Sequence, residues 1–370
     1  METPLNFGPQ HPSTHGVLHL IMKVDGENII EIEPDVGFIH RGLEKIAENR
    51  MYFKYTPVAN KIDYVAAAAW ENCYISCVEK LMNIKIPARA AYARVIILEL
   101  QRIISHVFWI GTLVMDLGQP TIFVWAMRER ERLLDIFEEI MGGRMTFGWM
   151  IIGGLRDDIT KPQCDMIIKE ISHLEKVLPE YYHLTEKNSI FCGRIKNVGV
   201  ITKEDAIAYG LTGPIAQASG VPYDVRKDDP YLVYDKLDFK MITRTSGDCY
   251  ARYEVRRDEI FESIKIIKQA IAMLPEGPYR ATNAITLKPP IALSMKTPVN
   301  GESFVRNECP RGEGAIFIVS DGSNFPYRLR IRGPSFNNLS IVATLCKGQN
   351  IPDMVATIAT LDPVFGECDR

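Results

Sequence analysis

The chain has 370 residues, of which 46% are hydrophobic and 24% are charged. These ordinary globular values exclude disordered, collagen-like and low-complexity proteins, and the length allows a large hydrophobic core. With 43 basic and 46 acidic residues the net charge is only -3, so the composition encodes no overall attraction to nucleic acid or anionic lipid.

The N-terminal part is predicted to change from sheet to helix. Residues 17–24 and 28–32 flank an Asp-Gly turn and predict a β-hairpin. From residue 42 to about 137 the apolar residues follow helical spacing on most faces, which predicts buried helices. Residues 127–141 form an amphipathic helix at the edge of this bundle, with Gly142 as its C-terminal stop.

The C-terminal half alternates between helical and irregular segments. Helices are predicted over 161–185 and 252–273, and the tract 193–230, rich in glycine, proline and aspartate, is predicted to hold loops and one short helix. Residues 314–320 and 326–331 predict two strands joined as a hairpin. The chain shows no internal repeat and no clear linker, so one domain is expected.

Export and membrane insertion are not indicated by the sequence. The N-terminus lacks the basic and then apolar pattern of a secretory signal. Apolar stretches such as 107–115 are shorter than the roughly 20 residues that span a bilayer, so any membrane contact is expected to be peripheral.

Two histidines, His11 and His15, lie in a turn rich in proline and glycine before the first predicted strand. Imidazoles on a fixed loop suit proton donation or metal binding. The pair alone is weak evidence for metal, because open zinc sites use three protein ligands. Histidines that only hydrogen-bond the backbone are the plainer interpretation.

Arg41 is the second candidate, placed where the predicted sheet gives way to helix. A guanidinium is always charged and suits the stabilisation of a reduced, negatively charged cofactor nearby. The plainer interpretation is an ordinary salt bridge to Glu44 or Asp35.

Asp63 and Tyr64 are the third candidate, predicted to lie on a helix ahead of the small, apolar residues 65–69. A phenol beside an acid suits hydrogen bonding to a ligand. A buried tyrosine with one hydrogen bond is more often a packing residue.

Eight cysteines occur without a CxxC pair, which fits a reducing cytoplasm better than a disulfide scaffold. Cys73 and Cys77 share one face of a predicted helix, but they lack further ligands and are interpreted as small buried hydrophobes. No Walker A loop, GxGxxG, GxSxG or HExxH motif is present.

Six segments, in order along the chain, resemble one family: GPQHPSTHGVLHL at 8–20, HRGLEK at 40–45, KIDYV at 61–65, SGDCYARY at 246–253, SDGS at 320–323 and LDPVFGECDR at 361–370. They resemble the NuoD-type (49-kilodalton-type) subunit of respiratory complex I, related to the large subunit of nickel-iron hydrogenases. The resemblance implies an α+β, predominantly α fold with a hydrogenase-like helical core, a small N-terminal β-sheet and a C-terminal β-hairpin region. It implies one domain, 1–370, with a β region at 1–40, a mainly helical core at 41–275 and a mixed region at 276–370.

The metal ligands of the hydrogenases are not found. Hydrogenases of this lineage hold nickel and iron through RxCGxC and DPCxxC motifs. The tract corresponding to the first, 57–63, has no cysteine; at the C-terminus Val364 and Glu367 stand where thiolates belong, and Cys368 is one position out of register. We therefore expect no metal in this chain and interpret the former metal cavity as a quinone pocket.

The resemblance also assigns roles to the candidate residues. His15 and Tyr64 match the residues that hydrogen-bond the quinone headgroup, with Asp63 adjoining them. Arg41 resembles the arginine that lies against the terminal iron-sulfur cluster of the adjacent small subunit, and His11 is placed in the pocket or near that cluster. Two proton donors suit the chemistry, because quinone reduction consumes two protons.

The implied partners are a small iron-sulfur subunit (NuoB-like), NuoC-like and ferredoxin-like NuoI-like subunits, and a membrane subunit (NuoH-like), at the cytoplasmic face of the membrane. No cofactor is expected on this chain itself, and no nucleic acid.

The segment RMTFGWMIIGG at 144–154 departs from the RMHAAYIRPGG-like pattern of many members. Thr146 replaces a histidine near the cluster and Ile151 replaces an arginine. Loss of a protonatable group should lower the potential of the cluster and uncouple it from pH. This favours a low-potential carrier such as menaquinone or methanophenazine, and an archaeal or anaerobic enzyme fed by reduced deazaflavin or ferredoxin.

Two other functions stay open from the sequence. One is an active membrane-bound nickel-iron hydrogenase subunit, against which the missing thiolates argue. The other is a scaffold with a vestigial pocket.

Overall fold

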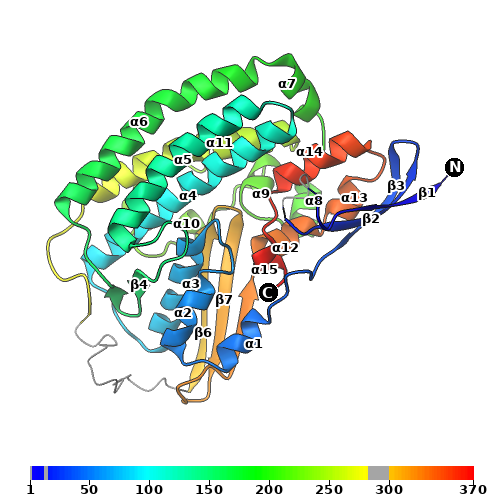
Figure 1. The fold of residues 1–370 in the computed structure, drawn as a ribbon. Coiled ribbons are helices and arrows are strands. Elements are labelled where there is room, and N and C mark those ends of the chain that lie inside the picture. Colours follow the sequence, from blue (N-terminus) through cyan, green and yellow to red (C-terminus); the bar gives the residue numbers. More distant parts are fainter. Residues whose placement is uncertain (1, 12–15, 282–299) are drawn as a thin grey trace.

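The N-terminal region is a small antiparallel sheet. The computed structural model describes residues 2–11, 16–281 and 300–370. Strands β1 (Thr3–Phe7), β2 (His19–Asp25) and β3 (Asn28–Asp35) pair in the order β1-β2-β3 (Figure 1). The predicted hairpin is confirmed as β2 and β3, while β1 was not predicted. Alternate residues of β2 are buried, which is typical of a sheet with one covered face.

Five helices follow: α1 (Leu43–Glu48), α2 (Tyr52–Ala59), α3 (Ala67–Leu81), α4 (Ala88–Asp116) and α5 (Pro120–Met141). They confirm the helical stretch predicted from 42 to 137. Pro120 occupies the first turn of α5, and Gly142 takes the left-handed conformation that ends it, as predicted. α4 is long and apolar enough to cross a bilayer, but 89% of its most apolar stretch is buried within the protein.

The middle of the chain adds the short strands β4 (Met150–Ile151) and β5 (Gly154–Leu155) and the helices α6 (Lys161–Glu186), α7 (Ser189–Ile195) and α11 (Cys249–Ala272). α6 and α11 confirm the two predicted long helices.

One prediction for this region is wrong. The tract 193–230 holds three short helices beyond the end of α7 rather than one: α8 (Lys203–Ala208), α9 (Pro214–Ala218) and α10 (Val225–Asp228), and a 3-10 turn (Tyr234–Lys236) follows. The reason is local capping. The side chains of Thr202 and Asp224 accept hydrogen bonds from the first turns of α8 and α10, and this offsets the low helical propensity of the tract.

The C-terminal region combines a second sheet with short helices. Strands β6 (Gly301–Cys309), β7 (Gly312–Ser320) and β8 (Arg328–Arg332) are antiparallel in that order. The predicted hairpin is confirmed as β7 and β8, and β6 was missed. Helices α12 (Pro334–Leu339), α13 (Val342–Leu345), α14 (Ile351–Leu361) and α15 (Phe365–Cys368) end the chain.

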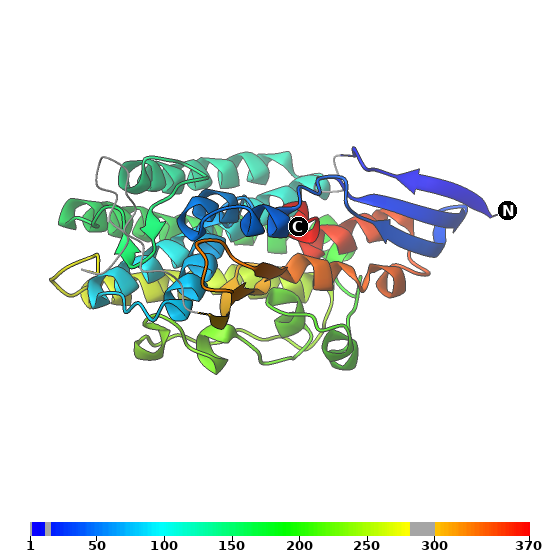
Figure 2. The same cartoon turned by 90° about the horizontal axis from the view of Figure 1, so that it is seen from below.

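The helices α4, α5, α6 and α11 form a bundle, α3, α7 and α14 pack against it, and the N-terminal sheet lies to one side, next to α13 (Figures 1 and 2). α3 packs between the bundle and the sheet β6-β7-β8, and the main core runs through all three. A second core lies under the N-terminal sheet, where β2 and β3 meet residues of α12, α13 and α14. The fold is thus α+β and predominantly α, as predicted.

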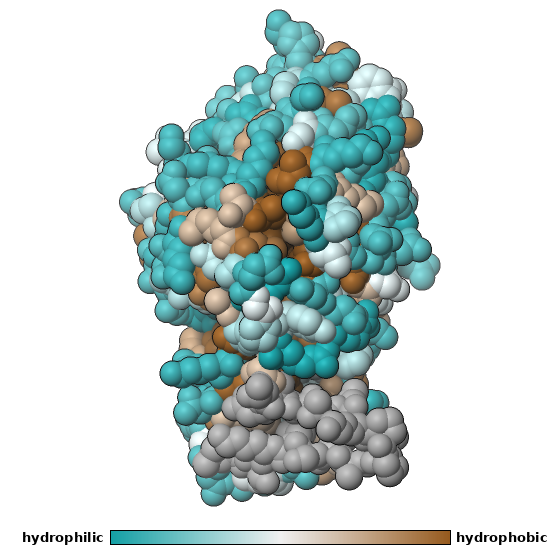
Figure 3. Space-filling model, turned by 90° about the vertical axis from the view of Figure 1, so that its left-hand side faces the viewer, coloured by the Kyte–Doolittle hydropathy of each residue, from teal (hydrophilic) through white to brown (hydrophobic). Residues whose placement is uncertain are grey.

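The surface at the end of the bundle that faces left in Figure 1 is mostly hydrophilic. Figure 3 shows this end, where hydrophobic residues form a strip between hydrophilic ones. Hydrophilic residues therefore cover most of this face, while the buried apolar residues form the interior.

Two glycines meet back to back where α9 approaches the start of β7. Gly213 has φ +65°, and a Cβ atom built on it would lie 2.5 Å from the Cα atom of Gly312. The two backbones cannot move apart without displacing Arg311, the residue before β7. The Arg311 guanidinium is buried at the wall of the pocket described below. Glycine is needed here both for its conformation and for the close approach.

We expect Gly213→Ala to lower the free energy of unfolding by about 2–4 kcal/mol, from backbone strain at φ +65° and ψ −149°, a conformation almost confined to glycine, plus overpacking. Gly26→Ala is the matched control, because Gly26 has φ +62° with nothing within 4 Å of a built Cβ atom. It should cost about 1 kcal/mol. Denaturant titration of the purified proteins measures both, and equal losses would contradict the close-approach argument.

Candidate functional site

A cavity of about 300 Å³, here called the α4 pocket, lies between the turn that follows α2, the C-terminal half of α4 and the chain after α14. Its apolar lining comes mainly from Phe108 and Met115 on α4 and from Val364. Its polar lining comes from Tyr64, Thr112, Asp116, Arg311 and Asp362. A small apolar pocket with a few polar groups at one end is typical of sites for small organic ligands.

The turn from residue 61 to 66 presents Tyr64 to this pocket. Asp63 Oδ1 accepts hydrogen bonds from the backbone N–H groups of Val65 at 2.8 Å and Ala66 at 3.1 Å. This aspartate turn separates α2 from α3, so Tyr64 lies in a turn and not on a helix as predicted. The prediction failed because the Asp63 side chain competes with helix formation at this point.

Arg311 joins two acidic residues of the pocket wall. Its Nη1 atom donates to Asp63 Oδ2 at 2.8 Å, and its Nε atom lies 3.3 Å from Asp362 Oδ2. Arg311 and Asp63 are at most 1% exposed. Burial raises the pKa of Asp63, and the Arg311 charge opposes that rise. The arginine therefore provides the compensation that buried carboxylates require.

Glu367 is a third buried carboxyl in the same region. Its oxygens accept hydrogen bonds from the Ser335 backbone N–H at 2.8 Å and from Trp70 Nε1 at 3.2 Å. Burial, followed by the negative charge of Asp63, raises the pKa of Glu367 to about 7. A carboxyl with this pKa exchanges its proton near neutral pH.

Tyr64 is suited to donate a hydrogen bond. The side chain is 39% exposed and borders the pocket. Burial and the neighbouring Asp63 both raise the pKa of its phenol, so the hydroxyl keeps its proton at neutral pH. Any acceptor oxygen that enters the pocket beside it can receive this hydrogen bond.

The structure treats the two predicted histidines differently. His15 lies outside the described residues, although its neighbour Gly16 borders the α4 pocket. His11 is exposed, and its ring centroid lies 4.1 Å from that of Phe7. The contact of either histidine with a ligand therefore stays a prediction.

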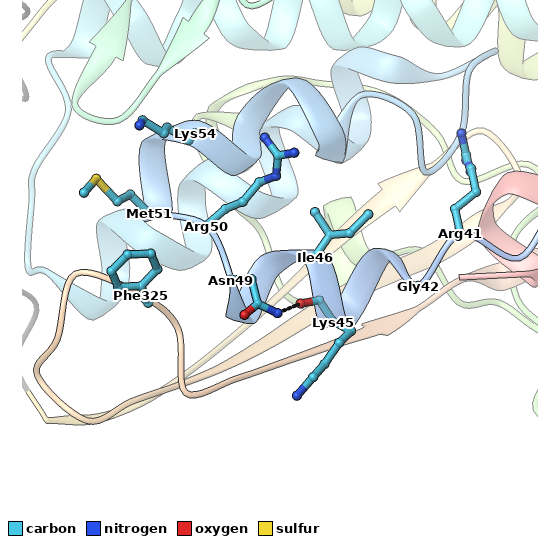
Figure 4. A pocket seen from close by; sticks show the side chains of 9 residues that line it. All are labelled: Arg41, Gly42, Lys45, Ile46, Asn49, Arg50, Met51, Lys54 and Phe325. Carbon is cyan, nitrogen blue, oxygen red and sulfur yellow. Dashed lines mark hydrogen bonds between the residues drawn. The ribbon is translucent and has the colours of Figure 1, made fainter.

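Arg41 lies at a second, open hollow of about 670 Å³ on α1 and α2 (Figure 4). The other basic residues of this hollow are Lys45, Arg50 and Lys54. Figure 4 shows Arg41 at one end, apart from Arg50 and Lys54. We call this surface the basic hollow.

The salt bridges considered for Arg41 are not formed. Its Nη2 atom donates to the carbonyl of Lys61 at 2.8 Å, directly before the turn that carries Tyr64. Glu44 pairs instead with Arg330 at 3.0 Å, and Asp35 pairs with His19 at 3.0 Å. The Arg41 charge is thus held by a carbonyl and is not neutralised by either acid.

The positions corresponding to hydrogenase thiolates have other uses here. Val364 borders the α4 pocket and Glu367 binds Trp70 and Ser335. Within the described residues, no group of three or more His, Cys, Asp and Glu side chains is placed to hold a metal ion. Cys73 and Cys77 are buried, and Cys77 Sγ lies 3.4 Å from carbonyl oxygens of β6 and β7, which supports their interpretation as packing residues.

Sequence reasoning missed Arg311, Asp362 as an ion-pair partner, and Glu367 as a titrating group. The LDPVFGECDR segment was interpreted only through the metal-binding cysteines that it lacks. The sequence around Arg311 does not indicate that this residue is buried, because its partners lie 248 and 51 residues away.

Comparison with known proteins gives consistent matches. A family profile described as "Respiratory-chain NADH dehydrogenase, 49 Kd subunit" matches residues 116–370. The chain is 44% identical to the D-type subunit of NADH-quinone oxidoreductase from Geobacillus kaustophilus, over 100% of this chain and 98% of that protein. It is 43% identical to the same subunit from Clostridium beijerinckii, over 100% and 97%, and 42% identical to one from Chloroherpeton thalassium, over 99% and 87%.

Glu367→Gln should change the pH dependence of stability. A carboxyl whose pKa rises from 4.5 to about 7 on folding costs nothing below pH 4.5, and its cost grows as pH rises toward 7. The variant removes this titration, so its thermal midpoint relative to wild type should rise between these pH values. Glu302→Gln, at an exposed position of β6, is the control and should show a constant difference. A constant difference for Glu367→Gln as well would contradict the raised pKa.

Proposed function

Because the chain belongs to the family of the 49-kilodalton subunit of respiratory-chain NADH dehydrogenase, we propose that it forms the quinone-reducing pocket of a complex I-type oxidoreductase. The observation that carries this proposal is the α4 pocket with Tyr64 at its wall. The three relatives described above are named as subunits of a quinone oxidoreductase, and the similarity extends over almost the whole chain.

The chemistry of the α4 pocket fits quinone reduction. Phe108, Met115 and Val364 provide apolar contacts for a ring and its lipid tail, and Tyr64 provides a hydrogen-bond donor for a carbonyl oxygen. A quinone that receives two electrons takes up two protons to become a quinol. Tyr64 is proposed to donate a hydrogen bond to one quinone oxygen, with Asp63 fixing the turn. His15 is proposed to hydrogen-bond the other quinone oxygen.

In the proposal, electrons reach the α4 pocket from a partner subunit. The iron-sulfur cluster belongs to the small NuoB-like subunit, and Arg41 is proposed to face it from the basic hollow. NuoC-like, NuoI-like and membrane NuoH-like subunits complete the proposed assembly at the cytoplasmic face of the membrane. Four basic side chains in one hollow support an acidic or electron-rich partner surface there.

The carrier is proposed to be a low-potential quinone such as menaquinone, on the basis of Thr146 and Ile151. The relatives described above come from bacteria and are named for a quinone. They give no support to methanophenazine as the carrier or to an archaeal source. Of the two carriers considered, quinone and methanophenazine, the proposal therefore keeps the quinone.

The two other functions differ from this proposal in what they require. A nickel-iron hydrogenase needs thiolates where Val364 and Glu367 stand. A scaffold with a vestigial pocket would not depend on the Tyr64 hydroxyl.

Tyr64→Phe in the assembled complex should lower the rate of quinone reduction at least tenfold, because the proton-donating hydroxyl is lost. The measurement is electron transfer from the reduced complex to menaquinone and ubiquinone analogues, with the iron-sulfur signals recorded in parallel. Tyr327→Phe, at an exposed loop position, is the control and should retain wild-type activity. Full activity of Tyr64→Phe would favour the scaffold.

Arg41→Met should lower the midpoint potential of the partner's terminal cluster, because a positive charge close to the cluster stabilises its reduced form. Redox titration followed by electron paramagnetic resonance measures the shift. Arg306→Met is the control, since Arg306 does not line the basic hollow and is engaged by Asp229, and it should leave the potential unchanged. An unchanged potential in Arg41→Met would place the cluster away from the basic hollow.

A further inference from the structure

The turn that presents Tyr64 to the α4 pocket is anchored from several sides within the protein interior. On one side, Gln101 Nε2 of α4 donates a hydrogen bond to the carbonyl of Val65 at 2.7 Å. On another side, Gly366 of α15 approaches so closely that a Cβ atom built on it would lie 2.5 Å from the carbonyl oxygen of Ile62. The buried ion pair described above is a third anchor. The position of the Tyr64 hydroxyl therefore depends on how this turn is held.

Arg41 supplies a further anchor, from the surface of the protein. Its Nη2 atom donates to the carbonyl of Lys61 at 2.8 Å, three residues before Tyr64. The Arg41 side chain is exposed and lines the basic hollow, whereas the three anchors just described are buried (Figure 4). This one hydrogen bond thus connects the basic hollow with the wall of the α4 pocket.

The segment before Arg41 is itself fixed, by Asp369 next to α15. The Asp369 carboxylate accepts hydrogen bonds from the backbone N–H groups of Gly37 at 2.9 Å and Ile39 at 3.0 Å. The backbone carbonyl of Asp369 lies 3.0 Å from His40 Nδ1. Because Arg41 extends from a fixed base, its hydrogen bond restricts the movement of the turn that receives it.

The charge of Arg41 also acts on Tyr64. Burial and the neighbouring Asp63 raise the pKa of the Tyr64 phenol, and the positive charge of Arg41 opposes this rise. The guanidinium is thus near enough to the phenol for an electrostatic effect in addition to the hydrogen-bonded link. A substitution of Arg41 changes both, so the charge and the hydrogen bond have to be separated by experiment.

We propose that Arg41 is a positioning residue for quinone binding: its hydrogen bond to the Lys61 carbonyl holds the turn where the Tyr64 hydroxyl reaches the quinone oxygen. The inference rests on the proposed function, because it concerns the same pocket and the same hydroxyl. It goes beyond the role proposed for Arg41 toward the partner's cluster, since it acts within this chain. Without this bond the turn is held from its buried side alone, and the hydroxyl is less often in place to donate.

The test is a double-mutant cycle between Arg41 and Tyr64 in the assembled complex. The dissociation constant of a short-chain menaquinone analogue is measured on the oxidised complex, so that the potential of the cluster and the supply of electrons do not enter. Arg41→Met should raise this constant about fivefold, the effect of one lost hydrogen bond. In the Tyr64→Phe background the same substitution should change it less than about twofold, because Arg41 acts through the hydroxyl. Equal effects in the two backgrounds, or none in either, would overturn the proposal.

Two further variants separate position from charge. Arg50→Met removes the same charge from the same hollow, where Arg50 lies apart from Arg41 (Figure 4), and it should leave the dissociation constant unchanged. Arg41→Lys keeps an N–H donor of similar reach, so it should stay within about twofold of wild type. An equal loss in Arg50→Met, or a loss in Arg41→Lys as large as that in Arg41→Met, would contradict a role for the hydrogen bond and overturn the proposal.

The design also covers a failure of assembly and a failure of the proposed function. If Arg41→Met does not assemble, Arg41→Ser carries the same test, because serine is polar, as the open hollow requires, and too short to reach the Lys61 carbonyl. If Tyr64→Phe weakens binding and the Arg41 variants do not, only the positioning role is overturned. If Tyr64→Phe itself leaves binding unchanged, the role of the hydroxyl in the proposed function is overturned together with this inference.

Discussion

The buried cluster of Arg311, Asp63 and Asp362 is the interaction on which the pocket depends. It joins the turn between α2 and α3, the connection between β6 and β7, and the end of α14. Removal of one partner from a buried ion pair typically costs about 3–5 kcal/mol, because a charge is left without compensation. The three segments are therefore held in one relative position, and Tyr64 is fixed at the pocket by the same turn.

The same cluster explains how the cavity is lined in the absence of thiolates. In the hydrogenase pattern, the corresponding C-terminal positions would supply soft ligands to a metal. Here the positive charge is that of Arg311, and carboxylates lie around it. The outcome is a polar wall beside the apolar residues of α4, which suits a small organic headgroup with a lipid tail.

The parts of the fold that could be predicted from the sequence depend on local patterns. The β2-β3 hairpin follows from its Asp-Gly turn, the long bundle helices follow from apolar spacing, and Gly142 ends α5 through its left-handed conformation. β6 was missed because it lies in a stretch with Glu302, Arg306 and Glu308, whose charges hide the strand pattern. Its partners β7 and α3 decide its place.

The candidate site was predicted only in part, for a related reason. Tyr64, Asp63 and Arg41 were singled out by residue type and position, and the family motifs then gave them roles that stay predictions. Arg311 has no local signature, because its contacts join residues far apart in the chain.

α4 finally contributes both to the pocket and to the interface with α11. One of its faces gives Phe108 and Met115 to the pocket, and the next gives His106 and Glu99 to the interface with α11. A helix is rigid over this distance, so the two faces keep a fixed spacing. Arg256 of α11 and Asp362 of the pocket wall interact through these surroundings, where burial strengthens electrostatic interactions.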